Sequence, residues 1–319
     1  MNTLLFNRLR LDGDIPRMDD EGLMAIDIHV KPSGAALAAD IEGVDLSRPL
    51  SAAALAVITD AWREHLVLRL RAQDLSDEDL LAFSRRFGPL DKAPINPYGA
   101  IWVPENPEMN VISNVRVDGQ RIGGLGDGEA FWHADMTYTD DPPRACMLFA
   151  LEVPDAGGDT GFASMIAAYA ALPRAMQRRL DGLQCKHDAS RNSTGQLRKD
   201  FDETYADVRA VPGAVHPLVR VHPDTGAKAL YPGRRNNAYV MGLAIDESEA
   251  LLDEIWGHVA KPEFNWHQQW RVGDLIMWDN RFVLHRRDAF DPNARRHMRR
   301  TQIGDVQPVL GPGDRIDAA

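Results

Sequence analysis

Short runs of apolar residues recur along the chain, and the spacing within most of them is that of β-strands. The segment LVLRLR at 66–71 alternates, IDIHV starts a strand at Ile26, and three aromatic residues share one strand face within 264–270. Unbroken apolar runs at 143–153 and 275–278 predict buried strands. Many short strands separated by turns, without regularly alternating helices, favour a β-sandwich or jelly roll over a doubly wound parallel sheet.

Three further segments space their apolar residues at helical intervals, and each begins with a capping signal. Ser51 precedes a helix through Trp62, and a serine–aspartate capping box opens a second helix at 76–87, which a Gly-Pro pair ends. Asp246 and Glu249 form a capping box before the third helix. The pattern therefore predicts a mainly β fold with flanking helices.

The glycine-rich stretch GGLGDG at 123–128 lies in a region rich in Pro, Gly and Asn, and it predicts a loop. Its glycine spacing differs from that of a dinucleotide-binding fingerprint, and no helical pattern follows it. We therefore do not assign it a nucleotide-binding role.

The composition limits the classes of partner. The 319 residues include 36 Lys and Arg and 47 Asp and Glu, which gives a formal net charge of −11. An acidic chain has no general electrostatic attraction to nucleic acid or to an anionic membrane, so we expect neither as a partner. No apolar run approaches the roughly 18 residues of a membrane-spanning helix. The two cysteines form neither a disulfide framework nor a thiolate zinc cluster, and we expect a cytoplasmic protein.

The strongest chemical signal is the tetrapeptide WHAD. On an extended strand, residues two apart point to the same side, so His133 and Asp135 can present an imidazole and a carboxylate to one point. A distant second histidine would complete a 2-His-1-carboxylate triad, which suits non-haem Fe(II) and leaves open positions for co-substrates. His285, after the apolar run at 275–278, is our candidate; the alternative for an isolated His-x-Asp is a salt-bridged strand histidine. The competing histidines are His216, His222 and His267.

A basic run follows His285, and it offers partners for an anionic ligand. If residues 294–301 form a strand, one face carries Arg296, Met298 and Arg300, and the opposite face carries Arg295, His297 and Arg299. One face would then place two guanidinium groups inward, with bidentate geometry for carboxylates. The alternatives are a solvated basic run and a short nucleic-acid patch, although the run has no interleaved aromatic residues.

Five motifs complete this pattern: WHADMTY, PDAGGDTGFASMIAAYAALP, HPLVRVHPDTGAKALY, GDLIMWDNRFVLHRRDAF and ARRHMRRTQIGD, in that order. Together they resemble the Fe(II)/2-oxoglutarate dioxygenases of the taurine dioxygenase and phenoxyacetate dioxygenase (TauD/TfdA) family. The resemblance spans residues 26–308, including the early segments SGAALAADIEGVDLSRPLS and LVLRLRAQDLSDEDLLAFSRRFGPL.

The resemblance implies a fold and an organisation. The fold is a double-stranded β-helix, a jelly roll with flanking helices, in which one site unites the three ligands. We accordingly expect a single dioxygenase domain at 24–319 after a loose N-terminal extension at 1–23. Related enzymes form dimers or tetramers, which implies a homo-oligomer here.

The resemblance also implies the role of individual residues. Thr160 and Arg296 match the residues that bind 2-oxoglutarate, and Arg300 matches the arginine that meets the acidic group of the prime substrate. Iron would be bound as Fe(II), with 2-oxoglutarate and O2 as co-substrates. Its ligands would be His133, Asp135 and His285.

The implied reaction is hydroxylation with release of succinate and CO2. Cleavage of a C–O, C–N or C–S bond follows where the hydroxylated carbon bears such a substituent. Asp135 favours hydroxylation, because related iron halogenases have a small residue at this place. The alternative is a cupin-like Zn or Mn hydrolase or isomerase with the same triad, which would leave Thr160 and Arg296 without a task.

Departures from the taurine enzymes narrow the substrate. Ala93 and Asn96 stand where those enzymes carry His and Tyr, so we do not expect taurine. The segment ISNVRVDG at 112–119 resembles the phenoxyacetate branch, which implies a small anionic substrate, a carboxylate with an apolar body. Candidates for the pocket, which serve equally well as loop supports, are Asn96, Tyr98, Asn114 and Phe131.

Overall fold

The computed structural model describes residues 28–96, 99–128, 130–198, 201, 205–233, 237–304 and 309–314. The predicted N-terminal extension at 1–23 lies outside these described residues, and the single domain at 24–319 stays a prediction. Within the described ranges, no helix is long and apolar enough to cross a membrane.

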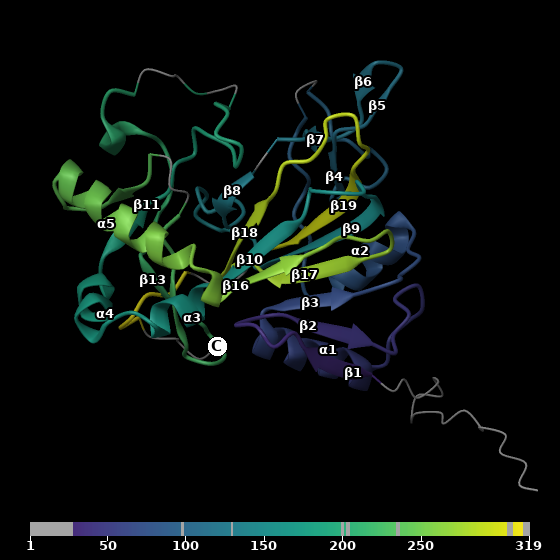
Figure 1. The fold of residues 1–319 in the computed structure, drawn as a ribbon, viewed down its shortest axis with the longest axis horizontal. Helices are drawn as coiled ribbons and strands as arrows, with labels where there is room; N and C mark the ends of the chain where they lie inside the picture. Colours follow the sequence, from purple (N-terminus) through teal and green to yellow (C-terminus); the bar gives the residue numbers. More distant parts are fainter. Residues whose placement is uncertain are drawn as a thin grey trace, which may run out of the picture.

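Two β-sheets pack face to face and form the jelly roll predicted from the sequence (Figure 1). Most neighbouring strands are antiparallel; β2 with β3 and β4 with β7 are parallel. In spatial order, the large sheet contains β1 (His29–Pro32), β2 (Ala39–Glu42), β3 (Val67–Leu70), β17 (Leu275–Asp279), β9 (Ala145–Glu152), β19 (His297–Ile303), β4 (Asn110–Ser113) and β7 (Gly124–Leu125). The small sheet contains β16 (Asn265–Gln268), β10 (Thr160–Ser164), β18 (Val283–Arg287) and β8 (Ala130–His133).

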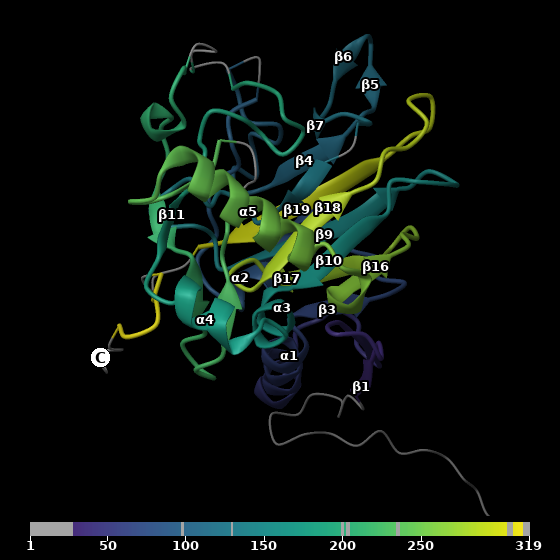
Figure 2. The ribbon, with the colours of Figure 1, turned by 60° about the vertical axis from the view of Figure 1, so that its left-hand side comes forward.

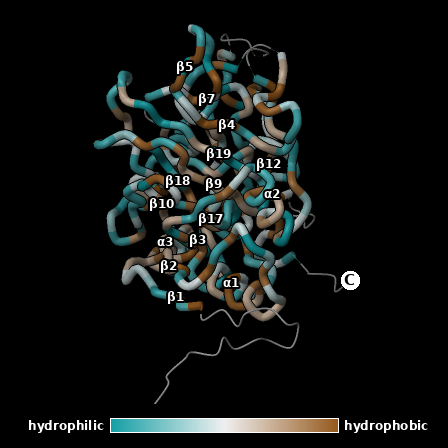
Figure 3. Tube along the Cα trace, turned by 90° about the vertical axis from the view of Figure 1, so that its right-hand side faces the viewer, coloured by the Kyte–Doolittle hydropathy of each residue, from teal (hydrophilic) through white to brown (hydrophobic). Residues whose placement is uncertain are grey.

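The central strand β9 is buried on both faces, which explains why its sequence is apolar at successive positions. Met147 and Phe149 point into a core shared with the helices on the outer face of the large sheet. Cys146 and Leu148 point into the second core, between the two sheets. A strand buried on both faces needs apolar residues at every position, and Figure 3 shows hydrophobic segments among the central strands.

Two helices cover the outer face of the large sheet, and their capping signals are confirmed. Ser51 caps α1 (Ala52–His65) by accepting a hydrogen bond from the backbone of the first turn. Ser76 and Asp79 form the predicted capping box of α2 (Asp77–Arg85).

A long excursion between β10 and β16 forms a separate layer beside the small sheet, which Figure 2 shows with α5 in front. It carries α3, whose residues pack on β14 and α5. Its elements are α3 (Met165–Ala170), α4 (Arg174–Leu180), β11 (Gln184–Lys186), the 3-10 helix η1 (Val208–Ala210), β12 (Val215–Pro217), β13 (Val219–Val221), β14 (Lys228–Leu230), β15 (Tyr239–Val240), α5 (Ile245–Val259) and η2 (Pro262–Phe264). Outside this excursion, β5 (Arg116–Val117) and β6 (Gln120–Arg121) form a small hairpin.

Several local predictions are wrong in detail. The loop predicted at 123–128 contains the short strand β7, and the strand expected at 294–301 begins only at His297. The third helix begins at Ile245 with Ala244 as its N-cap, so Asp246 and Glu249 do not form its capping box. Instead, the backbone N–H of Ala244 donates to the carboxylate of Glu247. The aromatic strand at 264–270 is also shorter, because its first residue belongs to η2 and its last lies beyond β16.

Candidate active site

The three predicted iron ligands come together on the small sheet. His133 ends β8 and lies directly opposite His285 in the antiparallel pair with β18, with ring centroids 4.2 Å apart. Asp135 lies two residues past the end of β8, so the expectation of one continuous strand is wrong, yet its carboxylate still turns to the histidines. Nε2 of His133 lies 3.6 Å from Oδ1 of Asp135, and Nε2 of His285 lies 3.7 Å from Oδ2 of the same carboxylate. One ligand atom from each of the three residues lies within 4.8 Å of the others.

Neighbouring groups fix the orientation of the first two ligands. Nδ1 of His133 lies 2.6 Å from the carbonyl oxygen of Phe131, which turns Nε2 toward the carboxylate. The side-chain amide of Asn280 holds the peptide of Asp135 at both ends, accepting from its N–H at 2.7 Å and donating to its carbonyl at 2.9 Å. The carboxylate is therefore positioned through its backbone by a residue 145 positions away.

The electrostatics of the site keep Asp135 ionised. Burial alone would raise the pKa of this carboxyl, but Arg300, His285 and His133 together hold it well below its ordinary value. A guanidinium nitrogen of Arg300 lies 3.3 Å from Oδ2. The thiol of Cys146 donates to the same oxygen at 3.4 Å, and burial raises the pKa of that thiol well above its ordinary value. Two imidazoles and one ionised carboxylate form the donor set that suits Fe(II).

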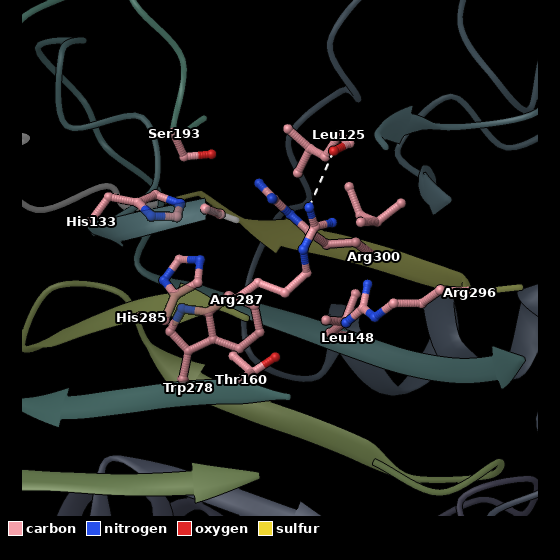
Figure 4. A pocket seen from close by; sticks show the side chains of 12 residues that line it. Leu125, His133, Leu148, Thr160, Ser193, Trp278, His285, Arg287, Arg296 and Arg300 are labelled. Carbon is pink, nitrogen blue, oxygen red and sulfur yellow. Dashed lines mark hydrogen bonds between the residues drawn. The ribbon is translucent and has the colours of Figure 1, made fainter. Parts of the chain in front are cut away.

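The histidines open into a cavity between the two sheets (Figure 4). Its walls combine apolar side chains with three arginines. The lining residues are Ile112, Leu125, Ala130, His133, Leu148, Thr160, Ser193, Trp278, His285, Arg287, Arg296 and Arg300.

The two residues matched to 2-oxoglutarate binding share a neighbour. The hydroxyl of Thr160 accepts a hydrogen bond from the indole N–H of Trp270 at 2.9 Å, and the Arg296 guanidinium lies 5.9 Å from the same ring. Burial lowers the pKa of Arg296 to about 9, and Arg287 contributes to this shift, so the group stays protonated at neutral pH. Its buried Nε has no hydrogen-bond partner among the described residues. A buried cation that forms no ion pair with a described carboxylate, and that lines the same cavity as the Thr160 hydroxyl, fits a bound carboxylate.

Arg287 is a cavity residue that our sequence reasoning missed. It lies two positions after His285 on β18, so both side chains face the cavity. The rule that residues two apart on a strand point to the same side, which we applied to WHAD, would have identified Arg287.

Three of the four predicted pocket residues lie in other surroundings. Phe131 is 48% exposed. Asn96 accepts from the backbone of Ala100, and Asn114 donates to the backbone of Ala294 at 2.7 Å. None of these three lines the cavity as far as the described residues show, and their substrate role stays a prediction. Tyr98 lies outside the described residues.

The competing histidines lie in other surroundings. His216 contacts the carbonyl oxygens of Thr137 and Thr139 in the buried layer of the excursion. His222 stacks on Phe282 with ring centroids 4.5 Å apart, and His267 is exposed on β16.

Residues 29–302 match the family model described as taurine catabolism dioxygenase TauD, TfdA family. The chain belongs to the TauD/TfdA family. Over 282 residues it is 39% identical to the alpha-ketoglutarate-dependent 2,4-dichlorophenoxyacetate dioxygenase of Cupriavidus pinatubonensis, covering 84% of this chain and 94% of that protein. It is 35% identical to the (S)-phenoxypropionate/alpha-ketoglutarate-dioxygenase of Sphingobium herbicidovorans, covering 86% and 94%. A taurine dioxygenase structure from Burkholderia xenovorans superposes with a TM-score of 0.73 at 31% identity, covering 90% and 92%.

This TauD/TfdA member is therefore a 2-oxoglutarate-dependent dioxygenase, an enzyme class that uses Fe(II), 2-oxoglutarate and O2. The family assignment decides against the Zn or Mn hydrolase or isomerase alternative. The residues present fit Fe(II) and 2-oxoglutarate, because they supply the His-Asp-His donor set for the metal together with buried cations for an anionic ligand.

Proposed function

We propose that this enzyme hydroxylates a small carboxylate with an apolar, aromatic body, at the carbon that bears an ether oxygen. Two similar relatives are named for aryloxyalkanoate substrates. The observation that carries the proposal is the cavity itself, in which the predicted metal centre, apolar walls and three arginines meet.

The triad residues His133, Asp135 and His285 would hold the iron. When bound, Fe(II) and 2-oxoglutarate activate O2 and supply the oxidant that attacks the substrate C–H bond. The protein itself positions the reactants and excludes water from the cavity. Arg296 and Thr160 would anchor the distal carboxylate of 2-oxoglutarate at the buried end of the cavity.

Arg300 would bind the carboxylate of the prime substrate. Its guanidinium lies beside the metal-binding carboxylate of Asp135, so a substrate acid that pairs with it is held close to the metal centre. Ile112, Leu125 and Leu148 supply apolar walls for the substrate body. Asn96, Tyr98, Asn114 and Phe131 stay proposed substrate contacts.

Hydroxylation beside an ether oxygen leads to bond cleavage by ordinary chemistry. The product is a hemiacetal, which collapses when its hydroxyl proton is lost and the C–O bond breaks. Phenoxyacetate would thus give phenol and glyoxylate, with succinate and CO2 from 2-oxoglutarate.

A substrate panel tests the proposal. With Fe(II), 2-oxoglutarate and air, we expect phenoxyacetate and 2,4-dichlorophenoxyacetate to stimulate succinate release, and anisole, which has the ether but no carboxylate, not to do so. Stimulation by alkyl sulfonates or sulfate esters alone would contradict a carboxylate substrate.

A homo-oligomer, as a dimer or tetramer, and a cytoplasmic location complete the proposal. Light scattering during gel filtration tests the first, with a mass of twice or four times 35.5 kDa expected.

A further inference from the structure

Arg287 enters the cavity because of the local geometry of the small sheet. On β18 it shares a face with His285, and the register to β8 shifts between these two residues. His285 pairs with His133, whereas Arg287 pairs with Ala130, so β8 carries one extra residue in this interval. Such a bulge re-aims side chains next to a functional site.

The Arg287 guanidinium forms its hydrogen bonds with the backbone of one segment, which also carries Asp127. It donates to the carbonyl oxygens of Leu125 at 3.2 Å and Gly126 at 3.1 Å, and also to that of Gly128. Figure 4 shows it reaching from β18 toward Leu125. All three acceptors belong to the glycine-rich segment 125–128, so a single planar group ties this segment to the small sheet.

The tied segment is conformationally strained and forms part of the cavity wall. Leu125 has φ of +70° and Gly126 has φ of +53°, and the left-handed region is costly for a leucine. Such residues persist only where their surroundings hold them in place. Leu125 also lines the cavity, so what holds the segment sets the position of the wall.

The burial of Arg287 shows that this arrangement is not a surface contact. The residue is 6% exposed, and burial lowers its pKa to about 10. Backbone carbonyls supply its hydrogen bonds, and the carboxylate of Asp127 raises its pKa without forming an ion pair with it among the described contacts. A buried cation that is hydrogen-bonded to the backbone carbonyls of one segment stabilises the position of that segment.

We propose that Arg287 is a specificity-determining positioning residue, which holds segment 125–128 against the cavity so that Leu125 forms a fixed wall beside the prime substrate. The wall limits the width of the apolar body that fits. The substrate consequence rests on the proposed function, whereas the tie between Arg287 and the segment does not.

Hydrogen–deuterium exchange of the full-length protein tests the tie directly. In Arg287→Leu we expect the amides of 125–128 to exchange about tenfold faster than in the wild type, because three hydrogen bonds to the segment are lost. The matched control is Arg286→Leu: Arg286 lies on the opposite face of β18, paired with Asp288 at 2.9 Å, and its replacement should leave this segment unchanged. Unchanged exchange at 125–128 in Arg287→Leu would overturn the proposal.

A second variant covers the case in which Arg287→Leu does not fold. Arg287→Lys keeps the charge, but an ammonium on a single stem cannot replace the planar fork at three carbonyls. We expect exchange at 125–128 in this variant to be about threefold or more above the wild type. Wild-type exchange in a folded Arg287→Lys protein would equally overturn the tie.

Steady-state kinetics test the substrate consequence. For Arg287→Leu we expect a higher KM for phenoxyacetate and a ratio of kcat/KM for 2-naphthoxyacetate over phenoxyacetate raised about tenfold. A ratio equal to that of the wild type would overturn the specificity role. If the wild type releases no succinate with either acid, the proposed substrate class fails, while the exchange experiment still decides the tie.

Discussion

Arg296 and Arg300 line the same cavity but contact different groups. Arg300 pairs with the carboxylate of Asp135, one of the three proposed metal ligands. Arg296 is almost fully buried beside Trp270 and has no ion pair with a described carboxylate. The two cations therefore suit two different anions, and each has its own test.

Replacing Arg296 should weaken binding of 2-oxoglutarate. Loss of a charge-assisted contact, worth about 1.5–3 kcal/mol, predicts a KM for 2-oxoglutarate roughly 10–100 times higher in Arg296→Ala. The control is Arg295→Ala, because Arg295 points outward to an exposed ion pair with Glu152. An unchanged KM in Arg296→Ala would remove this residue from the co-substrate site.

Asn280 should govern metal affinity without being a ligand. Asn280→Ala removes the hydrogen bonds that hold the peptide of Asp135, and we expect Mn(II) to bind roughly 10–100 times more weakly. Titration followed by electron paramagnetic resonance measures this directly. Asn293→Ala, in an exposed turn, is the control, and equal affinities in the two variants would contradict the role of Asn280.

Some of these residues were predictable from the sequence and others were not. Strand parity predicted that His133 would meet Asp135 and Arg296 would meet Arg300, and both pairs form although Asp135 lies past β8 and Arg296 lies just before β19. The same rule applied after His285 would have added Arg287. No local pattern predicts that Trp270 donates to Thr160, since the two are 110 positions apart and meet only through sheet packing.

At the scale of elements, β9 separates two cores and contributes to both. Its residues alternate between the helix-covered core and the cavity between the sheets, as Met147 and Leu148 illustrate. The same alternation runs along β17, where Met277 faces one core and Trp278 the other. On these strands, one residue therefore contributes to the stability of the helix-covered core, and the next residue contributes to the core between the sheets, where the cavity lies.

Two matched substitutions on β9 separate these effects. Met147→Ala and Leu148→Ala should each lower the free energy of unfolding by about 2–5 kcal/mol, because each removes buried apolar volume. Only Leu148 lines the cavity, so only its replacement should also change the KM for the prime substrate. Denaturant unfolding and steady-state kinetics measure the two quantities, and a substrate KM altered equally by both variants would contradict the alternation.

The helices that have a side-chain N-cap begin where the sequence predicts. Ser51 and Ser76 begin their helices as predicted. The third helix begins earlier than its best capping sequence, since Ala244 has no side-chain oxygen and only the Glu247 carboxylate caps the first turn. Ser248, inside this helix, accepts from the backbone of Val240 on β15, a tertiary contact that no helix pattern predicts.

For the whole molecule, the net charge of −11 says little about the active site. This acidic chain places three arginines around one cavity, two of them buried, so the net charge of the chain does not predict the charge of the cavity. The jelly-roll class followed from short, turn-separated strands, whereas the pairing of β8 with β18 needed the complete fold.

A buried ion pair makes the stability of the whole fold depend on pH. Asp279 and Arg281 pair at 2.7 Å, and both are at most 3% exposed. Burial raises the pKa of Asp279, but Arg281 outweighs it and the pKa is lowered, so the pair stabilises the protein above the ordinary carboxyl range. That stability is lost as the pH falls through the lowered pKa.

Asp279→Asn should cost about 3–5 kcal/mol at pH 7, because it leaves a buried guanidinium without its anion. The difference from the wild type should begin to shrink below about pH 4, where this carboxyl becomes protonated in the unfolded chain, and should go on shrinking until the pH has fallen through the lowered pKa of the folded protein. Denaturant unfolding at several pH values measures this, and a difference independent of pH would contradict the assignment.

The most direct test of the central claim is O2 uptake coupled to succinate formation, with Fe(II), 2-oxoglutarate and a carboxylate substrate. The account predicts activity in the wild type and its loss in His133→Ala and in Asp135→Ala, with folding verified by circular dichroism. Full activity in either variant would contradict a dioxygenase centre built on His133, Asp135 and His285.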